Sequence, residues 1–95
     1  MPAKFNKTKE AAAAKLFRAL GNPTRLWIVR QLAHQEYRVS DLVEAVGSEF
    51  ATVSRHLARL KSHKIICSRR KGREIWYSIN KNAVRMFLDL FKQED

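Results

Sequence analysis

A helical pattern gives way to a β pattern between residues 50 and 79, and this order of elements limits the fold more than any other feature. Over residues 50–63, helical spacing places on one side Phe50, Val53, Leu57, Leu60 and Lys64. Residues 65–70 and 73–79 are typical of strands, since the second is rich in β-branched and aromatic side chains. Lys71-Gly72 between them predicts a turn, because glycine accepts a positive φ. We therefore expect a helix followed directly by a β-hairpin.

The same part of the chain holds most of the net charge. Residues 50–73 contain eight Arg or Lys and no Asp or Glu, and so contribute +8 of the formal net charge of +10. A surplus confined to one stretch indicates a surface that binds a polyanion. The other side of the 50–63 helix carries small, hydroxylated or cationic residues, which can approach base edges and phosphates.

The remaining sequence predicts further helices within one domain of 95 residues. We expect residues 1–7 to be a flexible basic tail and residues 8–95 to form the folded domain. A first helix should end at Gly21, and a second should begin after Asn22-Pro23 and reach about residue 33. The residues expected to face inward on this second helix are Leu26, Val29 and Leu32 or Ala33. The other expected elements are a connector at 34–38, a third helix at 40–46 and a last helix at 83–92, capped by Asn80 or Asn82.

Composition excludes several classes of protein. Cys67 is the only cysteine, so the chain has neither an internal disulfide nor a four-cysteine zinc site. No apolar run approaches the length of a membrane span, and the first residues lack the apolar stretch of a secretory signal, so we expect a cytoplasmic protein. No nucleophile–base set, paired carboxylates or phosphate-binding loop indicates an enzyme.

Three motifs stand in a fixed order along the chain. Residues 20–26 read Leu-Gly-Asn-Pro-Thr-Arg-Leu, residues 52–57 read Thr-Val-Ser-Arg-His-Leu, and residues 72–79 read Gly-Arg-Glu-Ile-Trp-Tyr-Ser-Ile. Together they resemble the opening signature, the recognition helix and the wing of the ArsR/SmtB family of repressors. The resemblance implies a mainly α winged helix-turn-helix fold with a small β-hairpin, in a homodimer that binds an inverted repeat in double-stranded DNA. A sequence-neutral architectural DNA-binding protein and a protein-binding winged domain are the alternatives.

We expect the 50–63 helix to enter the major groove. Arg55 is the expected base-reading residue, and Arg59 should reach a phosphate. Phe50 is expected to pack inward, with contact to a thymine methyl group as the alternative. The full set of expected DNA-binding residues is Phe50, Ala51, Thr52, Ser54, Arg55, Arg59, Arg69, Arg70, Lys71 and Arg73.

The last helix carries more apolar residues than its own domain needs. Seven of the nine residues 83–91 are apolar, whereas a core-facing stripe covers only about 100° of a helix. We expect the surplus to contact the first and last helices of a second copy, although a helix absorbed by its own domain is the alternative. The expected dimer-interface residues are Leu16, Leu20, Val84, Phe87, Leu88 and Phe91.

The usual metal ligands of the family are missing. Arg38 and Ser40 stand where metal-sensing members often carry Cys-x-Cys, and the last helix has Asp89 but no histidine follows His63. We therefore expect no metal or other cofactor, and we expect each histidine to have an ordinary surface or hydrogen-bonding role. Cys67 is expected to be a small buried strand residue, and a redox-responsive thiol that makes the repressor sensitive to oxidation is the alternative.

Overall fold

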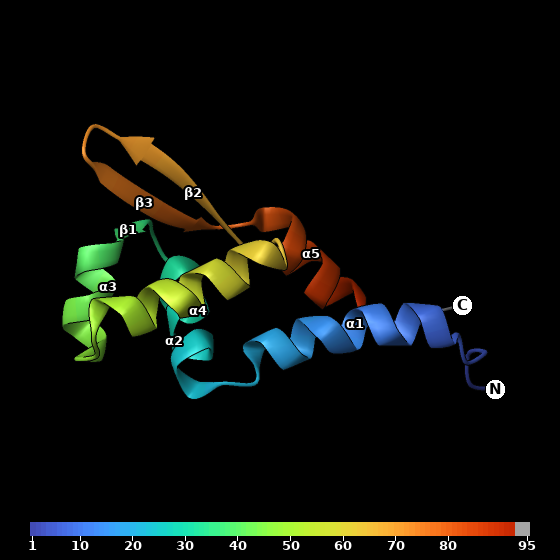
Figure 1. Cartoon of the computed structure of the whole chain (residues 1–95). Coiled ribbons are helices and arrows are strands. Elements are labelled where there is room, and N and C mark those ends of the chain that lie inside the picture. Colours follow the sequence, from blue (N-terminus) through green and yellow to red (C-terminus); the bar gives the residue numbers. More distant parts are fainter. Residues whose placement is uncertain (93–95) are drawn as a thin grey trace.

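The computed structural model describes residues 1–92 and has the winged helix-turn-helix fold that the sequence predicts (Figure 1). In chain order the elements are α1 (Lys7–Leu20), α2 (Pro23–Leu32), β1 (Tyr37–Arg38), α3 (Val39–Val46), α4 (Phe50–Ser62), β2 (Ile66–Lys71), β3 (Glu74–Ile79) and α5 (Lys81–Asp89). The expected helices and hairpin are confirmed, with ends shifted by a few residues. Because α1 begins at Lys7, the segment before the first helix ends at Asn6, one residue earlier than the expected tail of residues 1–7.

Local side-chain chemistry accounts for where the elements begin and end. The Asn22 side chain accepts hydrogen bonds from the backbone N–H groups of Thr24 and Arg25, at 2.9 and 3.1 Å, which starts α2. Gly47 ends α3 at φ 73°, and Gly72 closes the hairpin at φ 64°. Of the two expected caps of α5, Asn80 takes the role, accepting a 3.0 Å bond from the N–H of Asn82.

The sheet has one strand more than expected. Its order is β1-β3-β2, with both pairs antiparallel. The prediction of a simple connector at residues 34–38 is wrong at its end, because Tyr37 and Arg38 pair with Tyr77 and Trp76 of β3. Two residues are too few to show the alternation that marks a strand. Tyr37 and Arg38 form a strand because the edge of β3 that does not pair with β2 offers free backbone N–H and C=O groups.

Among residues 1–92, nine form the buried core, drawn from every element except β1, β3 and α5: Ala19, Ile28, Leu32, Leu42, Val53, Leu57, Leu60, Ile65 and Ile66. The inward face expected for α2 is partly wrong. Ile28 and Leu32 are buried, Val29 packs partly against the core, Ala33 is exposed, and Leu26 is 46% exposed. Ile28 lies two residues after Leu26, about 200° further round the helix, so burial of Ile28 turns Leu26 outward.

The molecule is elongated because α1 extends away from the other helices (Figure 1). It measures 53 × 21 × 18 Å, and its radius of gyration is 15.2 Å. A compact domain of this length has a radius of gyration of about 12 Å. None of the described residues of α5 is buried, so this helix is not absorbed by its own domain. Within residues 1–92, no helix combines the length and the apolar character needed to cross a membrane.

Candidate nucleic-acid interface

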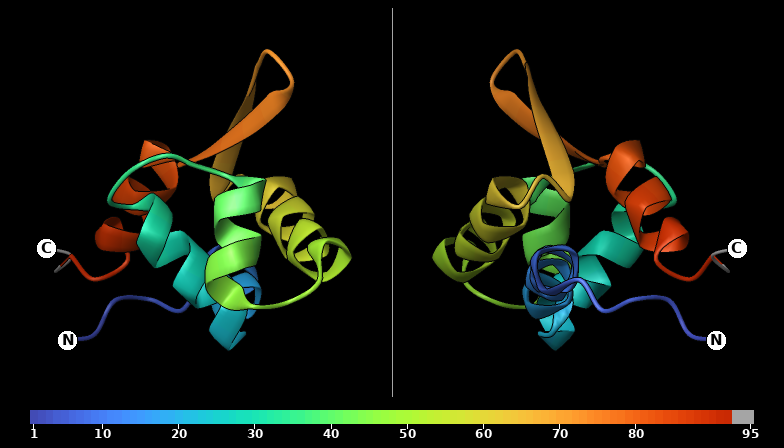
Figure 2. Two further views of the ribbon diagram at one scale, coloured as in Figure 1. Left: turned by 90° about the vertical axis from the view of Figure 1, so that its left-hand side faces the viewer. Right: turned by 90° about the vertical axis from the view of Figure 1, so that its right-hand side faces the viewer.

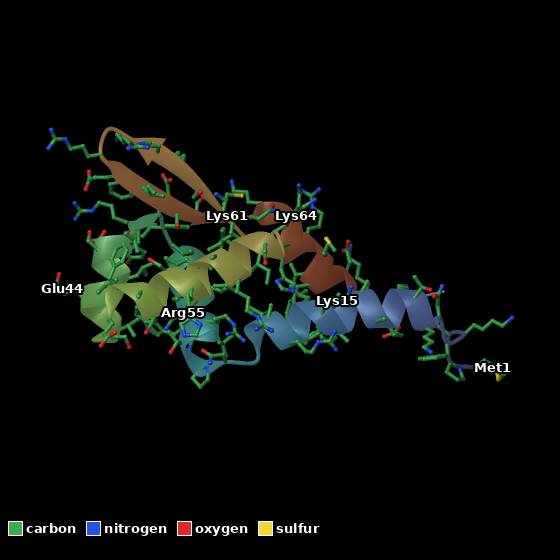
Figure 3. All side chains as sticks on the ribbon, in the orientation of Figure 1. Met1, Lys15, Glu44, Arg55, Lys61 and Lys64 are labelled. Carbon is green, nitrogen blue, oxygen red and sulfur yellow. The ribbon has the colours of Figure 1, made fainter. Side chains whose placement is uncertain are left out.

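Helix α4 turns one side to the core and presents the other to solvent. Val53, Leu57 and Leu60 are completely buried, whereas Arg55 and Arg59 are exposed. Figure 3 labels Arg55 on this helix, and Lys61 near its C-terminal end on the side that faces the wing. The two-sided arrangement that the sequence predicts is therefore present.

The first turns of α4 carry the other side chains expected at the bases. Ala51 is exposed, Thr52 and Ser54 are half-buried, and the Nη2 atom of Arg55 lies 3.4 Å from the Thr52 hydroxyl oxygen. The expectation that Phe50 packs inward is wrong, because its side chain is 59% exposed at the start of the helix. The core beneath α4 is already filled by residues one and two turns further along, so Phe50 remains on the surface.

Arg25, to which the sequence analysis assigned no role, links α4 to the end of α1. Arg25 donates a 2.6 Å hydrogen bond from Nε to the carbonyl oxygen of Ala19, at the end of α1, and its Nη1 lies 3.4 Å from Nδ1 of His56. Burial of His56 lowers its pKa, and the nearby charges of Arg25 and Arg55 lower it further. A largely neutral imidazole at neutral pH can accept the hydrogen bond from Arg25. This histidine thus has the hydrogen-bonding role expected of it.

The wing formed by β2 and β3 projects from the body of the molecule, with α4 on one flank and α5 on the other (Figure 2). The four cations expected to bind DNA from the wing are all exposed: Arg69, Arg70, Lys71 and Arg73. Gly72 lies among them at the turn, so the structure brings the cations to the free end of the hairpin.

The acid-free stretch of the sequence is not free of acids in space. Arg69 makes two 3.0 Å hydrogen bonds, from Nε and Nη2, to the carboxylate of Glu36, which precedes β1. These hydrogen bonds, with the charges of Arg69 and Lys71, lower the pKa of Glu36. Part of the cationic surplus of the wing is therefore balanced by a residue more than thirty positions earlier. A sequence window cannot show such a pairing.

Arg38, which was compared above with a cysteine of metal-sensing repressors, forms ion pairs. Its guanidinium contacts the carboxylates of Asp41 at 2.9 Å and Glu74 at 2.6 Å. The hydrogen bonds raise the pKa of Arg38 and lower that of Asp41. No group of three or more His, Cys, Asp or Glu in the described part of the chain is placed to hold a metal ion.

The prediction that Cys67 is buried is wrong. The thiol belongs to β2 opposite Ser78 of β3, and the residue is exposed. Ile66 next to it is buried, since side chains of successive strand residues point to opposite faces. Cys67 lies on the outer face of the hairpin for that reason.

Aromatic side chains join α1 to α5. The ring centroids of Phe17 and Phe87 lie 5.6 Å apart, and those of Phe87 and Phe91 lie 5.4 Å apart. Around them, Val84, Met86 and Leu88 are exposed. Large apolar side chains exposed together are typical of interaction surfaces.

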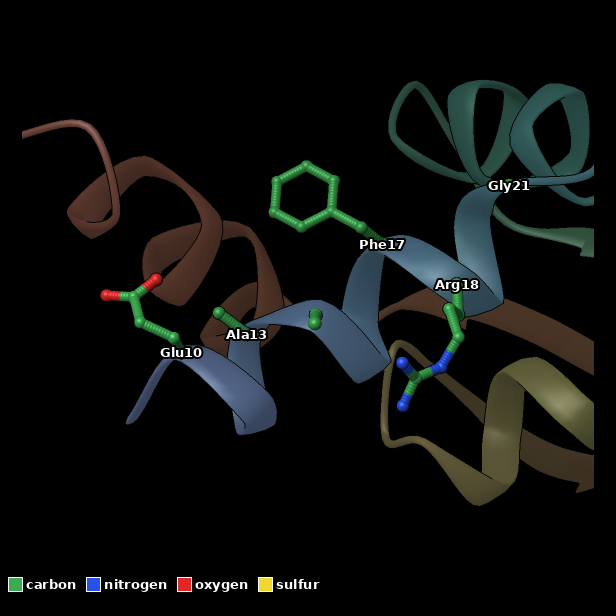
Figure 4. Close-up of a pocket in the computed structure, with 6 residues that line it drawn as sticks. Glu10, Ala13, Phe17, Arg18 and Gly21 are labelled. Carbon is green, nitrogen blue, oxygen red and sulfur yellow. The ribbon is translucent and has the colours of Figure 1, made fainter. Parts of the chain in front are cut away.

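Of the six expected interface residues, Leu16 and Leu20 pack partly against the chain's own core, and the other four belong to the α5 side. A groove of about 910 Å³ runs between α1 and α5, lined in part by Leu16, Met86 and Phe91. A second hollow of about 630 Å³ is lined by residues of α1 from Glu10 to Arg18, together with Gly21 (Figure 4). Both hollows border α1, the helix that extends from the body.

Known proteins are similar to this chain in sequence and in fold. The profile described as "Bacterial regulatory protein, arsR family" matches residues 22–66. The chain is 38% identical over 79 residues to the HTH-type transcriptional regulator NmtR of Mycobacterium tuberculosis, covering 83% of this chain and 66% of NmtR. It is 33% identical over 88 residues to the nodulation protein NolR of Rhizobium meliloti, covering 93% of this chain and 71% of NolR. For the regulator KmtR of M. tuberculosis, which is 35% identical over 74 residues, the match spans 78% of this chain and only 57% of KmtR.

Solved structures agree with the sequence matches. NolR from Sinorhizobium fredii superposes with a TM-score of 0.76 at 32% identity, covering 95% of this chain and 91% of that one. The homodimeric winged helix-turn-helix DNA-binding domain of a possible ArsR-family regulator from Mycobacterium bovis gives a TM-score of 0.75 at 29% identity, over 95% and 86% of the two chains. The fold, the order of the motifs and these similarities lead to one assignment: the chain belongs to the ArsR family of bacterial regulatory proteins.

Proposed function

We propose that this protein is a homodimeric, sequence-specific DNA-binding transcriptional repressor. The observation that carries the proposal is the cationic outer side of α4 placed beside a cationic wing. The N-terminal end of α4 and the free end of the wing lie at the same end of the molecule, away from the N-terminus (Figure 1). A helix with adjacent basic strands is a shape that fits the major groove and the phosphates beside it.

Each candidate residue has a distinct task in this proposal. Arg55, exposed near the start of α4, reads a guanine edge, because its guanidinium can donate two parallel hydrogen bonds there. Arg59, one turn later, contacts a phosphate. Phe50 contacts a thymine methyl group, which its exposure supports. Wing cations such as Lys71 lie along the backbone and supply affinity without reading sequence.

The second subunit is proposed to cover the apolar surface of α1 and α5. Exposed Phe91 and Leu88, together with the groove between these helices, support this placement. Twofold symmetry then presents two copies of α4 to major grooves about 34 Å apart, one helical turn of DNA. Binding to an inverted repeat in a promoter blocks transcription. Because bacterial DNA is cytoplasmic, we place the protein in the cytoplasm.

DNase footprinting on the DNA upstream of the reading frame tests the function. A protected inverted repeat, bound at least ~10³-fold more tightly than random duplex, supports a sequence-specific regulator. Equal affinity for both duplexes contradicts it and favours an architectural protein. No affinity for either duplex contradicts DNA binding altogether.

A pair of substitutions separates base reading from phosphate contact. Arg55→Ala should cost about 1–3 kcal/mol on the specific site and much less on random DNA, because a guanine contact is lost only on the specific site. Lys71→Ala, the matched control, should weaken both complexes alike and flatten the salt dependence by about one unit. Equal loss on both duplexes for Arg55→Ala removes Arg55 from base reading.

A further inference from the structure

We propose that Arg38 is a positioning residue for DNA binding: it forms an ionic bridge between α3 and the wing strand β3, and this bridge sets where the wing cations meet the DNA. The inference rests on the proposed DNA-binding function. The structural part of the inference, that Arg38 stabilises the position of the wing, is measured without DNA.

The geometry of the bridge is specific to a guanidinium. Arg38 Nη1 donates to Oε2 of Glu74 at 2.6 Å, while Nη2 and Nε donate to the two carboxylate oxygens of Asp41 at 2.9 and 3.2 Å. The backbone N–H of Arg38 also donates to Asp41 Oδ2, at 3.1 Å. A planar fork of donors can serve two carboxylates at once, which the single ammonium of lysine cannot reproduce. One side chain thus joins the first turn of α3 to the wing.

The same guanidinium contacts the aromatic part of the wing. Its carbon lies 5.6 Å from the ring centroid of Trp76, the residue opposite Arg38 in the β1–β3 pairing. The indole N–H of Trp76 is buried and has no hydrogen-bond partner among the described residues. The cation–π attraction of Arg38 therefore acts on an indole ring that no hydrogen bond from the described residues orients.

The wing depends on such contacts because it has little other support. Its outer residues, 69–75, are all exposed, and β1 contributes only two residues to the sheet. Glu74 is the β-sheet partner of Lys71 at the last position before the turn, so the bridge contacts the hairpin near its free end. Glu36 likewise forms an ion pair with Arg69 on the other wing strand, β2. Residues 36–38 thus contact both wing strands.

A positioning role for the Glu74 carboxylate and the effect of its charge alone predict opposite changes in DNA affinity when Glu74 is neutralised. Glu74 is an acid at the free end of a cationic wing, so its carboxylate repels phosphates, and removal of that charge alone should tighten DNA binding. If the carboxylate positions the wing, its removal should weaken binding in spite of the gained charge. The ion pairs of Arg38 are partly exposed, so the bridge itself should weaken with added salt.

The experiment compares the full chain with Glu74→Gln, Arg38→Lys and Glu44→Gln. Arg38→Lys keeps the charge and loses the fork, and Glu44→Gln removes the same charge as Glu74→Gln from the exposed side of α3. Amide hydrogen exchange of residues 66–79 is followed without DNA, and affinity for the footprinted site is measured at two salt concentrations. We expect Glu74→Gln and Arg38→Lys to speed exchange by about 3-fold, the scale of an exposed ion pair, and to weaken DNA binding, with Glu44→Gln unchanged or tighter.

Two outcomes separate the possible failures. Binding by Glu74→Gln as tight as by Glu44→Gln, with unchanged exchange, overturns the bridge and leaves the proposed function intact. A wild-type protein that ignores its upstream DNA, while exchange still rises in Glu74→Gln, overturns the proposed function and supports the hold of Arg38 on the wing.

Discussion

Truncation of Phe91 tests the proposed dimer surface most directly. Phe91 is 69% exposed, yet its ring contacts Phe17 and Phe87 within the same chain. A phenylalanine buries about 200 Å² when it is fully covered, so about 140 Å² of Phe91 is available to a partner subunit. Phe91→Ala removes that surface while leaving the buried core untouched.

The magnitude follows from this area. At about 25 cal/mol per Å², complete coverage contributes about 3.5 kcal/mol per subunit, and half coverage contributes about 2 kcal/mol. A twofold dimer loses the contact twice, so half coverage predicts a loss of about 3–4 kcal/mol per dimer. The dissociation constant of the dimer should therefore rise by about 10²- to 10³-fold.

Sedimentation equilibrium over a range of protein concentrations measures the change. Phe50→Ala is the matched control, since it is the same substitution at a residue 59% exposed on α4. Circular dichroism should show that both variants keep the helical content of the wild type. A dimer of Phe91→Ala as tight as that of the wild type would refute the assignment of the surface. An equal weakening by Phe50→Ala would also refute it, because the loss would not belong to the α1–α5 face.

Two further predictions concern stability. Asn22→Ala should lower the free energy of unfolding by about 1 kcal/mol, because two N–H groups lose their acceptor; urea titration measures it, and a loss no larger than that of Asn6→Ala, at the exposed cap of α1, would contradict it. Burial of His56 lowers its pKa in the folded state, so the unfolded chain takes up a proton more readily. The free energy of unfolding should therefore fall as pH drops through the ordinary titration range of histidine, and His56→Gln should flatten that dependence; an unchanged slope in urea titrations at several pH values would argue against it.

Much of the fold was predictable because it depends on contacts within a few residues. Asn22-Pro23 starts a helix through hydrogen bonds two and three residues away, and Gly72 closes a hairpin through its own backbone freedom. The apolar period of residues 50–63 depends on helix geometry alone and correctly placed Val53, Leu57 and Leu60 in the core. Charge along the chain likewise indicated which side of α4 faces solvent.

Only the tertiary structure decided how these elements are held together. Burial of Ile28 in place of Leu26 depends on which side of α2 meets the other helices, and several orientations fit the same apolar residues. The strand at Tyr37 exists because of a partner forty residues later, and the ion pairs of Arg38 with Glu74 and of Glu36 with Arg69 join positions more than thirty residues apart. Local sequence determines periodicity, caps and turns because those energies arise within one or two turns of the chain. Pairing across the molecule depends on distances that exist only after the chain has folded.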